Sequence, residues 1–399
     1  MKGEPFHIEI EPTNICNTRC LHCPHEALAR PMGKMDWETY QSVLDKVIAY
    51  APEFSVEYAG MGEPLLNPEI YRFIAAVSPR AQTTMTTNAS ALTERNVERL
   101  IEAGLSRLTV SFNGDDPTIY ELMMGGLSFE RAEKNLRAAI EMTSKTSTRV
   151  VANVSVTRQT QDRLADIKAY LQTAGVQDIY FSKCHSRGGF LKGDVVCTTP
   201  LLTTDMGRCD IFTETLFIAW TGEVLSCCHD LAGANVIGDL KAEALEDILA
   251  RKQQHAARGI DFEICGKCND LYRFMNDATP DGRTISDWVY SLYTNPTTTD
   301  ENNGESGPLV EWLYRVYAAE GKGEGFFGSI AAQTAASERN FKAQLAEQQR
   351  QIADLQHQIE DIHAGQAWKL AAQLRKARLA LIPEGSSRET LFERLIKKP

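Results

Sequence analysis

The first two hundred residues alternate between two hydrophobic periods. Short runs rich in Val, Ile, Phe, Tyr and Thr have the pattern of strands, and the stretches between them repeat apolar positions every three to four residues. Helix stop signals such as Gly104 and Gly175 end several of these stretches. Six such units in succession predict an α/β fold with a parallel sheet and right-handed crossovers. The predicted strands are residues 6–11, 54–59, 82–87, 106–112, 149–156 and 177–182, and the predicted helices are residues 36–50, 68–77, 93–103, 128–143 and 162–174.

A smaller region follows this α/β domain. Residues 216–225 predict a β-hairpin that turns at Thr221 and Gly222, and residues 243–256 predict a helix. Residues 294–308 are polar and rich in Thr, Asn, Gly and Pro, which is typical of a linker. The predicted divisions are an α/β domain at residues 1–200, a small second domain at 201–275, a linker with short helices at 276–330, a coiled-coil helix at 331–365 and a basic amphipathic tail at 366–399.

The coiled coil is predicted from a heptad seam near the C-terminus, which favours a homodimer or a partner helix; docking onto the chain's own α/β domain is the alternative. The basic helix around Trp368 could also lie on an anionic membrane surface. Its Trp-Lys-Leu pattern looks like the tails of enzymes of bacterial surface-polysaccharide assembly. The seam consists of Phe341, Leu345, Gln348, Ile352, Leu355, Ile359 and Ile362.

Composition narrows the class of protein. The net charge of −11 argues against nucleic-acid binding, which needs a basic surface. Residues 1–5 lack the apolar core of a signal peptide, and no apolar run approaches the length of about 18 residues that a membrane span needs. Ten cysteines in such a chain indicate metal ligation rather than disulfides. A cytoplasmic location is therefore expected.

Three cysteines follow the first predicted strand. Cys16, Cys20 and Cys23 have the spacing C-x3-C-x2-C on one short loop. A four-iron cluster takes four thiolates and a structural zinc takes four ligands, so three thiolates leave one corner of a metal centre open for a small molecule. A zinc knuckle completed by His22 or His25 is the alternative.

This loop resembles that of the radical S-adenosylmethionine (SAM) superfamily. The resemblance implies a partial (βα)6 barrel and a [4Fe-4S] cluster whose open iron chelates SAM. It also implies release of a 5′-deoxyadenosyl radical, after one electron arrives from a donor such as flavodoxin or ferredoxin. His22 stands where the family often has an aromatic residue.

Three later motifs extend the resemblance, each after the expected strand. Residues 60–63, Gly-Met-Gly-Glu, look like the family's Gly-Gly-Glu, which contacts the methionine amine. Residues 87–89 resemble Thr-Asn-Gly, and residues 111–114 resemble Ser-Ile-Asp-Gly. An arginine that often follows the last motif is missing, so Arg158 or Arg187 is the candidate partner of the SAM carboxylate. The resemblance implies SAM contacts from Gly60, Gly62, Glu63, Asn88, Ser111 and Asn113, with Asn153 on the fifth strand as a further candidate.

A second set of cysteines lies in the smaller region. The predicted hairpin brings Cys209 near Cys227, and the following helix returns the chain to Cys265 and Cys268, which gives four thiolates for a closed metal site. The layout resembles the SPASM/twitch extension of radical SAM enzymes, in its single-cluster form, and implies an auxiliary [4Fe-4S] cluster. Zinc is the alternative metal. Cys228 is interpreted as a packing residue that could exchange with Cys227, and Cys197 has no assigned role.

Three residues after the sixth strand are candidate catalytic groups. Cys184 could donate a hydrogen atom to a substrate radical, as in radical SAM epimerases, or be a small buried hydrophobe. His185 could be a general base or a solvated loop residue. Arg187 could bind a carboxylate or a phosphate.

The resemblance therefore implies an enzyme that abstracts a hydrogen atom from a substrate C–H bond. Oxidation or epimerisation of a sugar or nucleotide sugar is the favoured activity, because of the tail. Modification of a ribosomally made peptide is the first alternative. A non-catalytic metal-stabilised scaffold, dimerised by its tail, is the alternative from another class.

Overall fold

The computed structural model describes residues 6–191, 195, 207–260, 262–280, 282–294, 307–319, 346–358, 360 and 365–382. The chain divides into two units, residues 1–330 and residues 331–399.

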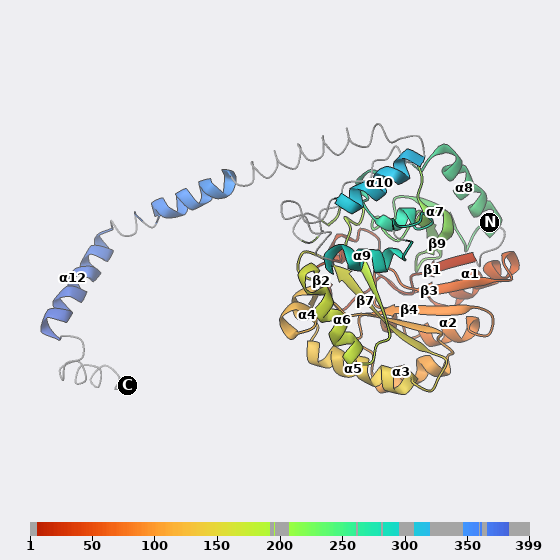
Figure 1. Ribbon diagram of the computed structural model, residues 1–399, viewed down its shortest axis with the longest axis horizontal. Coiled ribbons are helices and arrows are strands. Elements are labelled where there is room, and N and C mark those ends of the chain that lie inside the picture. The colour runs from red at the N-terminus through yellow and green to blue at the C-terminus, as the bar shows by residue number, and fades with distance from the viewer. Residues whose placement is uncertain are drawn as a thin grey trace. The chain divides into compact units, whose positions relative to one another are not determined.

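One nine-stranded sheet forms the centre of the first unit (Figure 1). Six strands pair in parallel, as the sequence predicts: β1 (Phe6–Ile10), β3 (Phe54–Tyr58), β4 (Gln82–Thr87), β5 (Arg107–Ser111), β7 (Arg149–Val156) and β8 (Asp178–Lys183). On the other side of β1, strand β9 (Thr215–Ile218) adds in parallel, and β10 (Glu223–Leu225) and β11 (Val236–Asp239) continue the sheet antiparallel. The second predicted domain thus extends the sheet of the first.

Helices cover the outer face of this sheet. They are α1 (Trp37–Tyr50), α2 (Ile70–Val77), α3 (Glu94–Glu102), α4 (Pro117–Met123), α5 (Phe129–Thr143) and α6 (Leu164–Thr173). Side chains of Asp36, Thr93 and Ser128 cap α1, α3 and α5 by accepting backbone N–H groups of the first turn. Except for α4, which the sequence analysis did not predict, these strands and helices confirm the predicted ranges to within two residues.

The two faces of the sheet differ in chemistry. Ile8 and Tyr58 are buried on the helix side, where the Tyr58 hydroxyl lies 2.6 Å from that of Tyr40 in α1. Since alternate residues of a strand point to opposite faces, His7, Glu9 and Glu57 point to the inner face. All three are only partly buried. The inner face is therefore polar and only partly accessible.

The predicted hairpin is confirmed, with β9 and β10 joined through Gly222 at φ +90°. Helix α7 (Asp210–Glu214) precedes it, and α8 (Leu245–Arg258) confirms the predicted helix near 243–256. Two further helices, α9 (Ile285–Thr294) and α10 (Gly307–Ala319), belong to the core of this unit. Trp288 of α9 packs against Trp312 of α10, whose indole donates a hydrogen bond to the Ala278 carbonyl.

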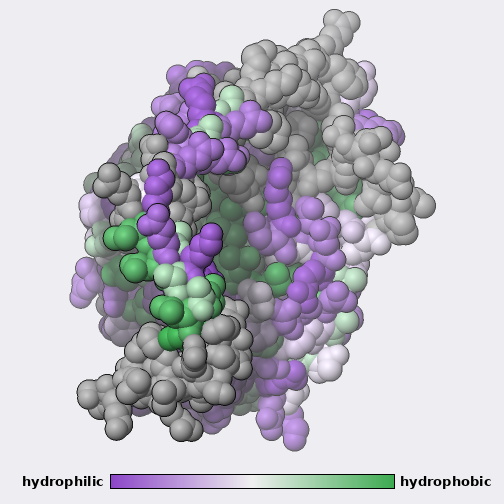
Figure 2. Space-filling model, turned by 90° about the vertical axis from the view of Figure 1, so that its left-hand side faces the viewer, coloured by the Kyte–Doolittle hydropathy of each residue, from purple (hydrophilic) through white to green (hydrophobic). Residues whose placement is uncertain are grey.

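The second unit contains helical residues 346–358 and helix α12 (Gln366–Leu381). Within it Ile352 and Leu355 of the predicted seam are each more than half exposed. Phe341, Leu345, Ile359 and Ile362 lie outside the described residues, so the coiled coil stays a prediction. Hydrophobic groups lie among hydrophilic ones on the face shown in Figure 2. Among the described helices, none is long and apolar enough to span a membrane.

Candidate functional site

The first thiol centre lies on the loop that follows β1. The Thr18 hydroxyl lies 3.3 Å from the sulfurs of both Cys16 and Cys20, so it holds these two thiols on one side of the loop. Cys20 belongs to the short strand β2 (Arg19–Cys20), which pairs with β6 (Met124–Gly125). Burial and the nearby thiols of Cys23 and Cys16 raise the pKa of Cys20 to about 12. The three thiols therefore form one compact, partly buried group.

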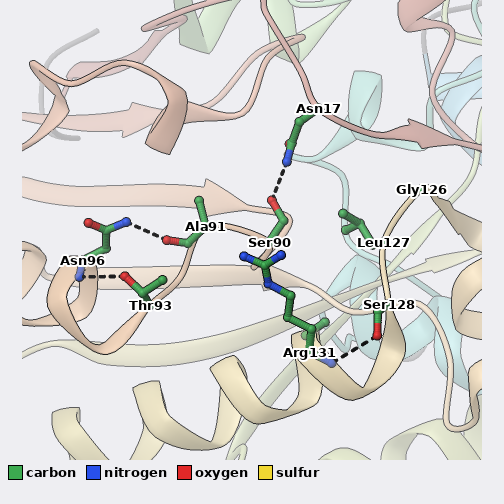
Figure 3. Close-up of a pocket in the computed structure, with 10 residues that line it drawn as sticks. Asn17, Ser90, Ala91, Thr93, Asn96, Gly126, Leu127, Ser128 and Arg131 are labelled. Atoms are coloured by element: carbon green, nitrogen blue, oxygen red, sulfur yellow. Dashed lines mark hydrogen bonds between the residues drawn. The ribbon is translucent and has the colours of Figure 1, made fainter.

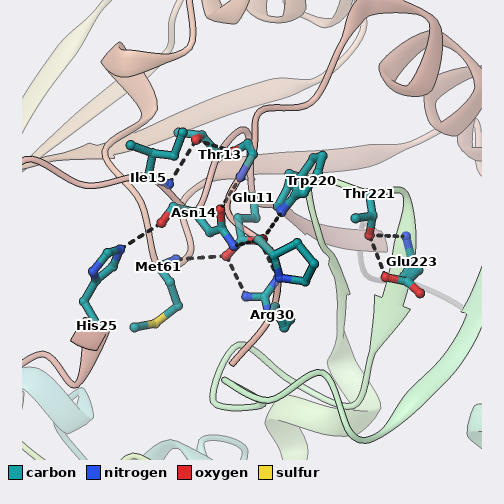
Figure 4. Close-up of polar contacts among 12 residues, drawn as sticks. Glu11, Thr13, Asn14, Ile15, His25, Arg30, Met61, Trp220, Thr221 and Glu223 are labelled. Atoms are coloured by element: carbon teal, nitrogen blue, oxygen red, sulfur yellow. Dashed lines mark hydrogen bonds and ion pairs between the residues drawn. The ribbon is translucent and has the colours of Figure 1, made fainter. Parts of the chain in front are cut away.

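Buried polar contacts fix this loop (Figure 4). Glu11, fully buried just after β1, forms a two-pronged ion pair with Arg30 at 2.8 and 2.9 Å. The Asn14 side chain bonds the Pro31 carbonyl and the Gly33 amide. His25 Nε2 lies 2.8 Å from the Asn14 carbonyl, so this nitrogen already has a partner and does not serve the zinc alternative. His22 differs, because its buried Nδ1 has no partner in the described structure.

The glycines of residues 60–63 allow close packing against the cysteine loop. A Cβ on Gly60, at φ +123°, would lie 2.8 Å from Cγ of Glu11, and a Cβ on Gly62 would lie 2.1 Å from the Thr13 carbonyl oxygen. Glu63 is buried and accepts hydrogen bonds from the Thr87 hydroxyl at 2.7 Å and the Asn88 amide at 2.8 Å. The structure thus gives these three predicted SAM contacts a definite role in holding two loops together.

Asn88 and Asn113 follow the carboxyl ends of β4 and β5, and Asn153 lies within the neighbouring strand β7. Asn88 donates to the Asn17 side chain at 3.1 Å, and its Nδ2 is 4.0 Å from Cys16 Sγ. Asn113 is fully buried; its Oδ1 accepts the Ser155 amide, and its Nδ2 contacts Met124 beside Cys20. Asn153 pairs in register with Ser111 and accepts the Ser182 hydroxyl at 2.8 Å. Asn88, Asn113, Ser111 and Asn153 therefore form the edge of the sheet beside the first thiol centre.

The second thiol centre surrounds a small, partly open cavity. Cys209, Cys227, Cys265 and Cys268 line it, together with Ile211, Ile264, Gly188, His229 and Arg273. Burial and the three other thiols raise the pKa of Cys227 well above its usual value. Cys228 is not part of this wall. Cys227, rather than its neighbour, therefore lies among the other three thiols.

The chemistry of this cavity suits an anionic cluster. Arg273 is 1% exposed, and its two terminal nitrogens donate to the carbonyls of Cys265 and Arg208, each at 3.2 Å. Its buried Nε has no protein partner in the described structure. Lys252, also buried, donates to the Thr215 carbonyl and lies within electrostatic range of Cys209 and Cys227. Four thiolates and inorganic sulfide would supply the charge and the hydrogen-bond acceptor that these groups lack.

A buried polar network lies between the two centres. Asp270 Oδ2 is 3.4 Å from Nε2 of His185 and 3.5 Å from Nε2 of His229. The three groups are close enough to bind a metal ion. However, Nδ1 of His185 accepts the Arg187 amide at 3.2 Å, which places the proton of the neutral ring on Nε2, toward Asp270. Burial also lowers the pKa of His185 well below its usual value, which keeps the ring neutral and makes it a weak general base.

Several residues of this region were not predicted from the sequence. Glu9, on the inner face of β1, lies beside Cys228, and burial together with Glu57 raises the pKa of Glu9 to about 8. His229 and Asp270 each lie two residues after a cysteine of the second thiol centre, Cys227 and Cys268. The alternation in residues 6–10 was the available signal, because its polar positions must point opposite to Ile8 and Ile10.

A separate pocket of about 470 Å³ adjoins the cysteine loop (Figure 3). Asn17 and Ser90, joined by a hydrogen bond of 2.8 Å, form part of its wall, with Arg131 from the start of α5. No residue that the sequence analysis assigned to chemistry lines it.

Comparison with known proteins defines the class. Residues 10–168 match the radical SAM superfamily, and residues 209–269 match SPASM, an iron–sulfur cluster-binding domain. This chain belongs to the radical SAM superfamily and carries a C-terminal SPASM domain. Its cofactors are accordingly SAM, the [4Fe-4S] cluster that binds SAM, and an auxiliary iron–sulfur cluster.

Individual relatives share only parts of the chain. A probable GTP 3′,8-cyclase of Methanococcus maripaludis is 29% identical over 141 residues, 34% of this chain and 46% of that protein. The S-adenosyl-L-methionine-dependent 2-deoxy-scyllo-inosamine dehydrogenase of Niallia circulans is 29% identical over 108 residues, 26% of this chain and 43% of that protein. The chain thus spans about half the length of the curated relatives it matches. The structure of native anSMEcpe with bound AdoMet superimposes with a TM-score of 0.52 at 15% identity, covering 74% of this chain and 98% of that one, which supports the fold.

Proposed function

We propose that this radical SAM enzyme oxidises a hydroxyl-bearing carbon of a sugar or nucleotide sugar to a carbonyl. The observation that carries the proposal is the second cavity, where Arg273 lines the wall with four thiols and the buried Lys252 lies within electrostatic range of two of them. Oxidation requires an acceptor for one electron, and epimerisation does not. The partial similarity to a 2-deoxy-scyllo-inosamine dehydrogenase supports the same reaction class.

When bound, SAM and the first cluster supply a 5′-deoxyadenosyl radical, and the auxiliary cluster supplies an electron acceptor. The chain's own residues position the reactants. Glu63 fixes Asn88 beside Cys16, and the inner face offers Glu9, Glu57 and Ser182 as partners for substrate hydroxyls. Burial on both sides of this space limits water around the reacting groups.

The alcohol must lose a hydrogen atom, an electron and a hydroxyl proton to become a carbonyl. We assign the proton to a carboxylate oxygen of Glu9, because a pKa of about 8 is suited to a general base near neutral pH. In epimerisation, a thiol would instead return a hydrogen atom to carbon. Cys184 is buried, whereas Cys228 is partly accessible and faces Glu9.

The test is anaerobic turnover of the reconstituted enzyme with candidate sugars, nucleotide sugars and peptides. We expect 5′-deoxyadenosine and a product two mass units lighter than the substrate. Cys20→Ala should stop formation of 5′-deoxyadenosine, whereas Cys265→Ala should leave it and stop the oxidation. Deuterium uptake from solvent would favour epimerisation, a modified peptide would favour the peptide alternative, and absence of 5′-deoxyadenosine under every reductant would refute the proposal.

A further inference from the structure

Arg187 lies on a short segment that both domains hold in place. The segment leaves β8, and the Ser186 amide donates to Asn269 Oδ1 at 2.6 Å. His185 contacts Asp270 from the same loop, and a Cβ on Gly188 would lie 3.3 Å from Ile264. Residues 185–188 are thus fixed between the barrel and the loop that carries Cys265 and Cys268.

The backbone of Arg187 is strained. Its φ is +49°, a left-handed conformation that is unfavourable for a residue with a Cβ. Ala89 is the other non-glycine residue with positive φ among the described residues. Such strain persists where neighbouring contacts over-determine the conformation, and it is concentrated at binding and catalytic sites.

The guanidinium of Arg187 has no hydrogen-bond or ion-pair partner among the residues that the structure describes. The side chain is only partly accessible, and an unpaired charge in such a position is costly. Its electrostatic neighbours come from both halves of the site: Cys23 on the first cysteine loop, Cys184 after β8, and Cys228 and Asp270 of the second domain. The free guanidinium therefore lies in the space between the two thiol centres.

We propose that Arg187 binds an anionic group of the substrate, a carboxylate or a phosphate. This inference rests on the proposed function in taking the space between the thiol centres as the substrate site. The planar guanidinium forms paired, charge-assisted hydrogen bonds with both kinds of anion. The substrate class is thereby narrowed to acidic sugars, sugar phosphates and nucleotide sugars.

SAM is the other molecule with a carboxylate at this site. The residues expected to contact SAM lie after β3, β4 and β5 and on β7. The neighbours of Arg187 come instead from β1, the end of the cysteine loop, the segment after β8 and the second domain. This arrangement favours the substrate over SAM as the source of the anion.

The test measures binding of inorganic phosphate to anaerobically purified holoenzyme by equilibrium dialysis at low ionic strength. Wild type should bind one phosphate per chain. Arg187→Gln should weaken this binding at least about tenfold, as expected for loss of a charge-assisted contact, and Arg187→Lys should give an intermediate affinity. Arg131→Gln is the matched control, because it removes an exposed guanidinium from the separate pocket, and it should bind phosphate as wild type does.

Equal phosphate affinity in wild type and Arg187→Gln would overturn the proposal. A parallel dialysis with SAM separates the two anions. A tenfold loss of SAM affinity in Arg187→Gln, with phosphate competing for the same site, would assign Arg187 to the SAM carboxylate. That result would also overturn the proposal. Iron and sulfide content shows whether each variant contains its iron–sulfur clusters. If Arg187→Gln fails to assemble them, the comparison of Arg187→Lys with wild type still tests the proposal. Failure of wild type to form 5′-deoxyadenosine would refute the proposed function but leave the phosphate result standing.

Discussion

Trp220 packs directly onto Gly33: a Cβ placed on Gly33 would lie 2.3 Å from Cη2 of the indole ring. The same indole donates from Nε1 to the Pro31 carbonyl at 3.2 Å. Trp220 belongs to the β9–β10 hairpin, and Gly33 lies on the segment that braces the first cysteine loop through Asn14. The pair therefore connects the SPASM domain to the loop of the first cluster.

Gly33→Ala should displace the indole and break its bond to Pro31. We expect a loss of about 1–3 kcal/mol in the free energy of unfolding, as for other overpacked sites. Trp220→Ala removes the obstacle, so the double variant should be destabilised by less than the sum of the two single variants. Urea denaturation of all four proteins measures this, and strictly additive effects would contradict the contact.

Arg30→Ala should leave the carboxylate of Glu11 buried without its partner. Removing one member of a buried ion pair costs about 3–5 kcal/mol, and here the loss should also reduce iron bound at the first centre. Arg315→Ala, which breaks an exposed pair with Glu311, is the control and should cost at most about 1 kcal/mol. Similar unfolding free energies for the two variants would show that Glu11 does not depend on Arg30.

Cys227→Ala and Cys228→Ala should differ in metal content although the residues are adjacent. Cys227 lines the second cavity, so its loss should remove about four irons per chain, the content of one [4Fe-4S] cluster. Cys228 faces Glu9 instead, and its variant should keep both clusters. Iron and sulfide analysis of anaerobically purified protein decides the point, and the reverse result would exchange the two assignments.

Arg273→Gln should lower the reduction potential of the auxiliary cluster, because it removes a buried positive charge and changes the Nε donor in the cavity wall. A shift of about 59 mV corresponds to a tenfold change in the one-electron equilibrium. Lys267→Gln removes an exposed charge nearby and should shift the potential much less, since solvent and salt screen it. Redox titration followed by electron paramagnetic resonance measures both variants. Equal potentials in wild type and Arg273→Gln would exclude this electrostatic role.

Glu9 should make stability and turnover depend on pH. Its pKa of about 8 in the folded chain lies above the usual value of 4.5, so the folded state retains this proton at a pH where the unfolded state has lost it. The stabilisation is complete below pH 4.5 and is lost as the pH rises through 8. Glu9→Gln should therefore gain stability relative to wild type from pH 5 to pH 9, as thermal unfolding at a series of pH values would show.

The same group should shape the pH profile of the enzyme. If Glu9 accepts the substrate proton, product formation by wild type should increase through about pH 8, and Glu9→Gln should lose this rise. Formation of 5′-deoxyadenosine is the internal control, because it does not require this proton transfer. A wild-type profile that is flat through pH 8 would remove Glu9 from the reaction.

The parallel sheet was predictable because its strands and helices carry strong local periodicity. Residues 82–87 and 129–143 lie within one residue of the predicted ranges. The cysteine sets were recognisable from spacing alone, and the structure brings the second set to one cavity. These features depend on short stretches of sequence, which one chain displays directly.

The remaining features depend on contacts between distant segments. Arg187, His229 and Asp270 meet only because residues 185–188 dock on the loop after Cys268, and no local pattern encodes that docking. Helix α9 precedes and helix α10 follows the polar stretch at 294–308, which was interpreted from the sequence as a linker. Trp288 of α9 and Trp312 of α10 are buried against one another, so the core of this unit continues past the polar stretch.

Strand β9 pairs with β1 from Thr215 to Ile218, so the two family regions share one continuous set of backbone hydrogen bonds. Cutting the chain ahead of residue 215 would expose an open edge on β1, which invites association with other chains. Chimaeras that exchange the cluster-binding domain between relatives should therefore keep residues 215–218 together with the barrel and place the junction beyond Ile218. The auxiliary region is an extension of the barrel rather than a detachable module.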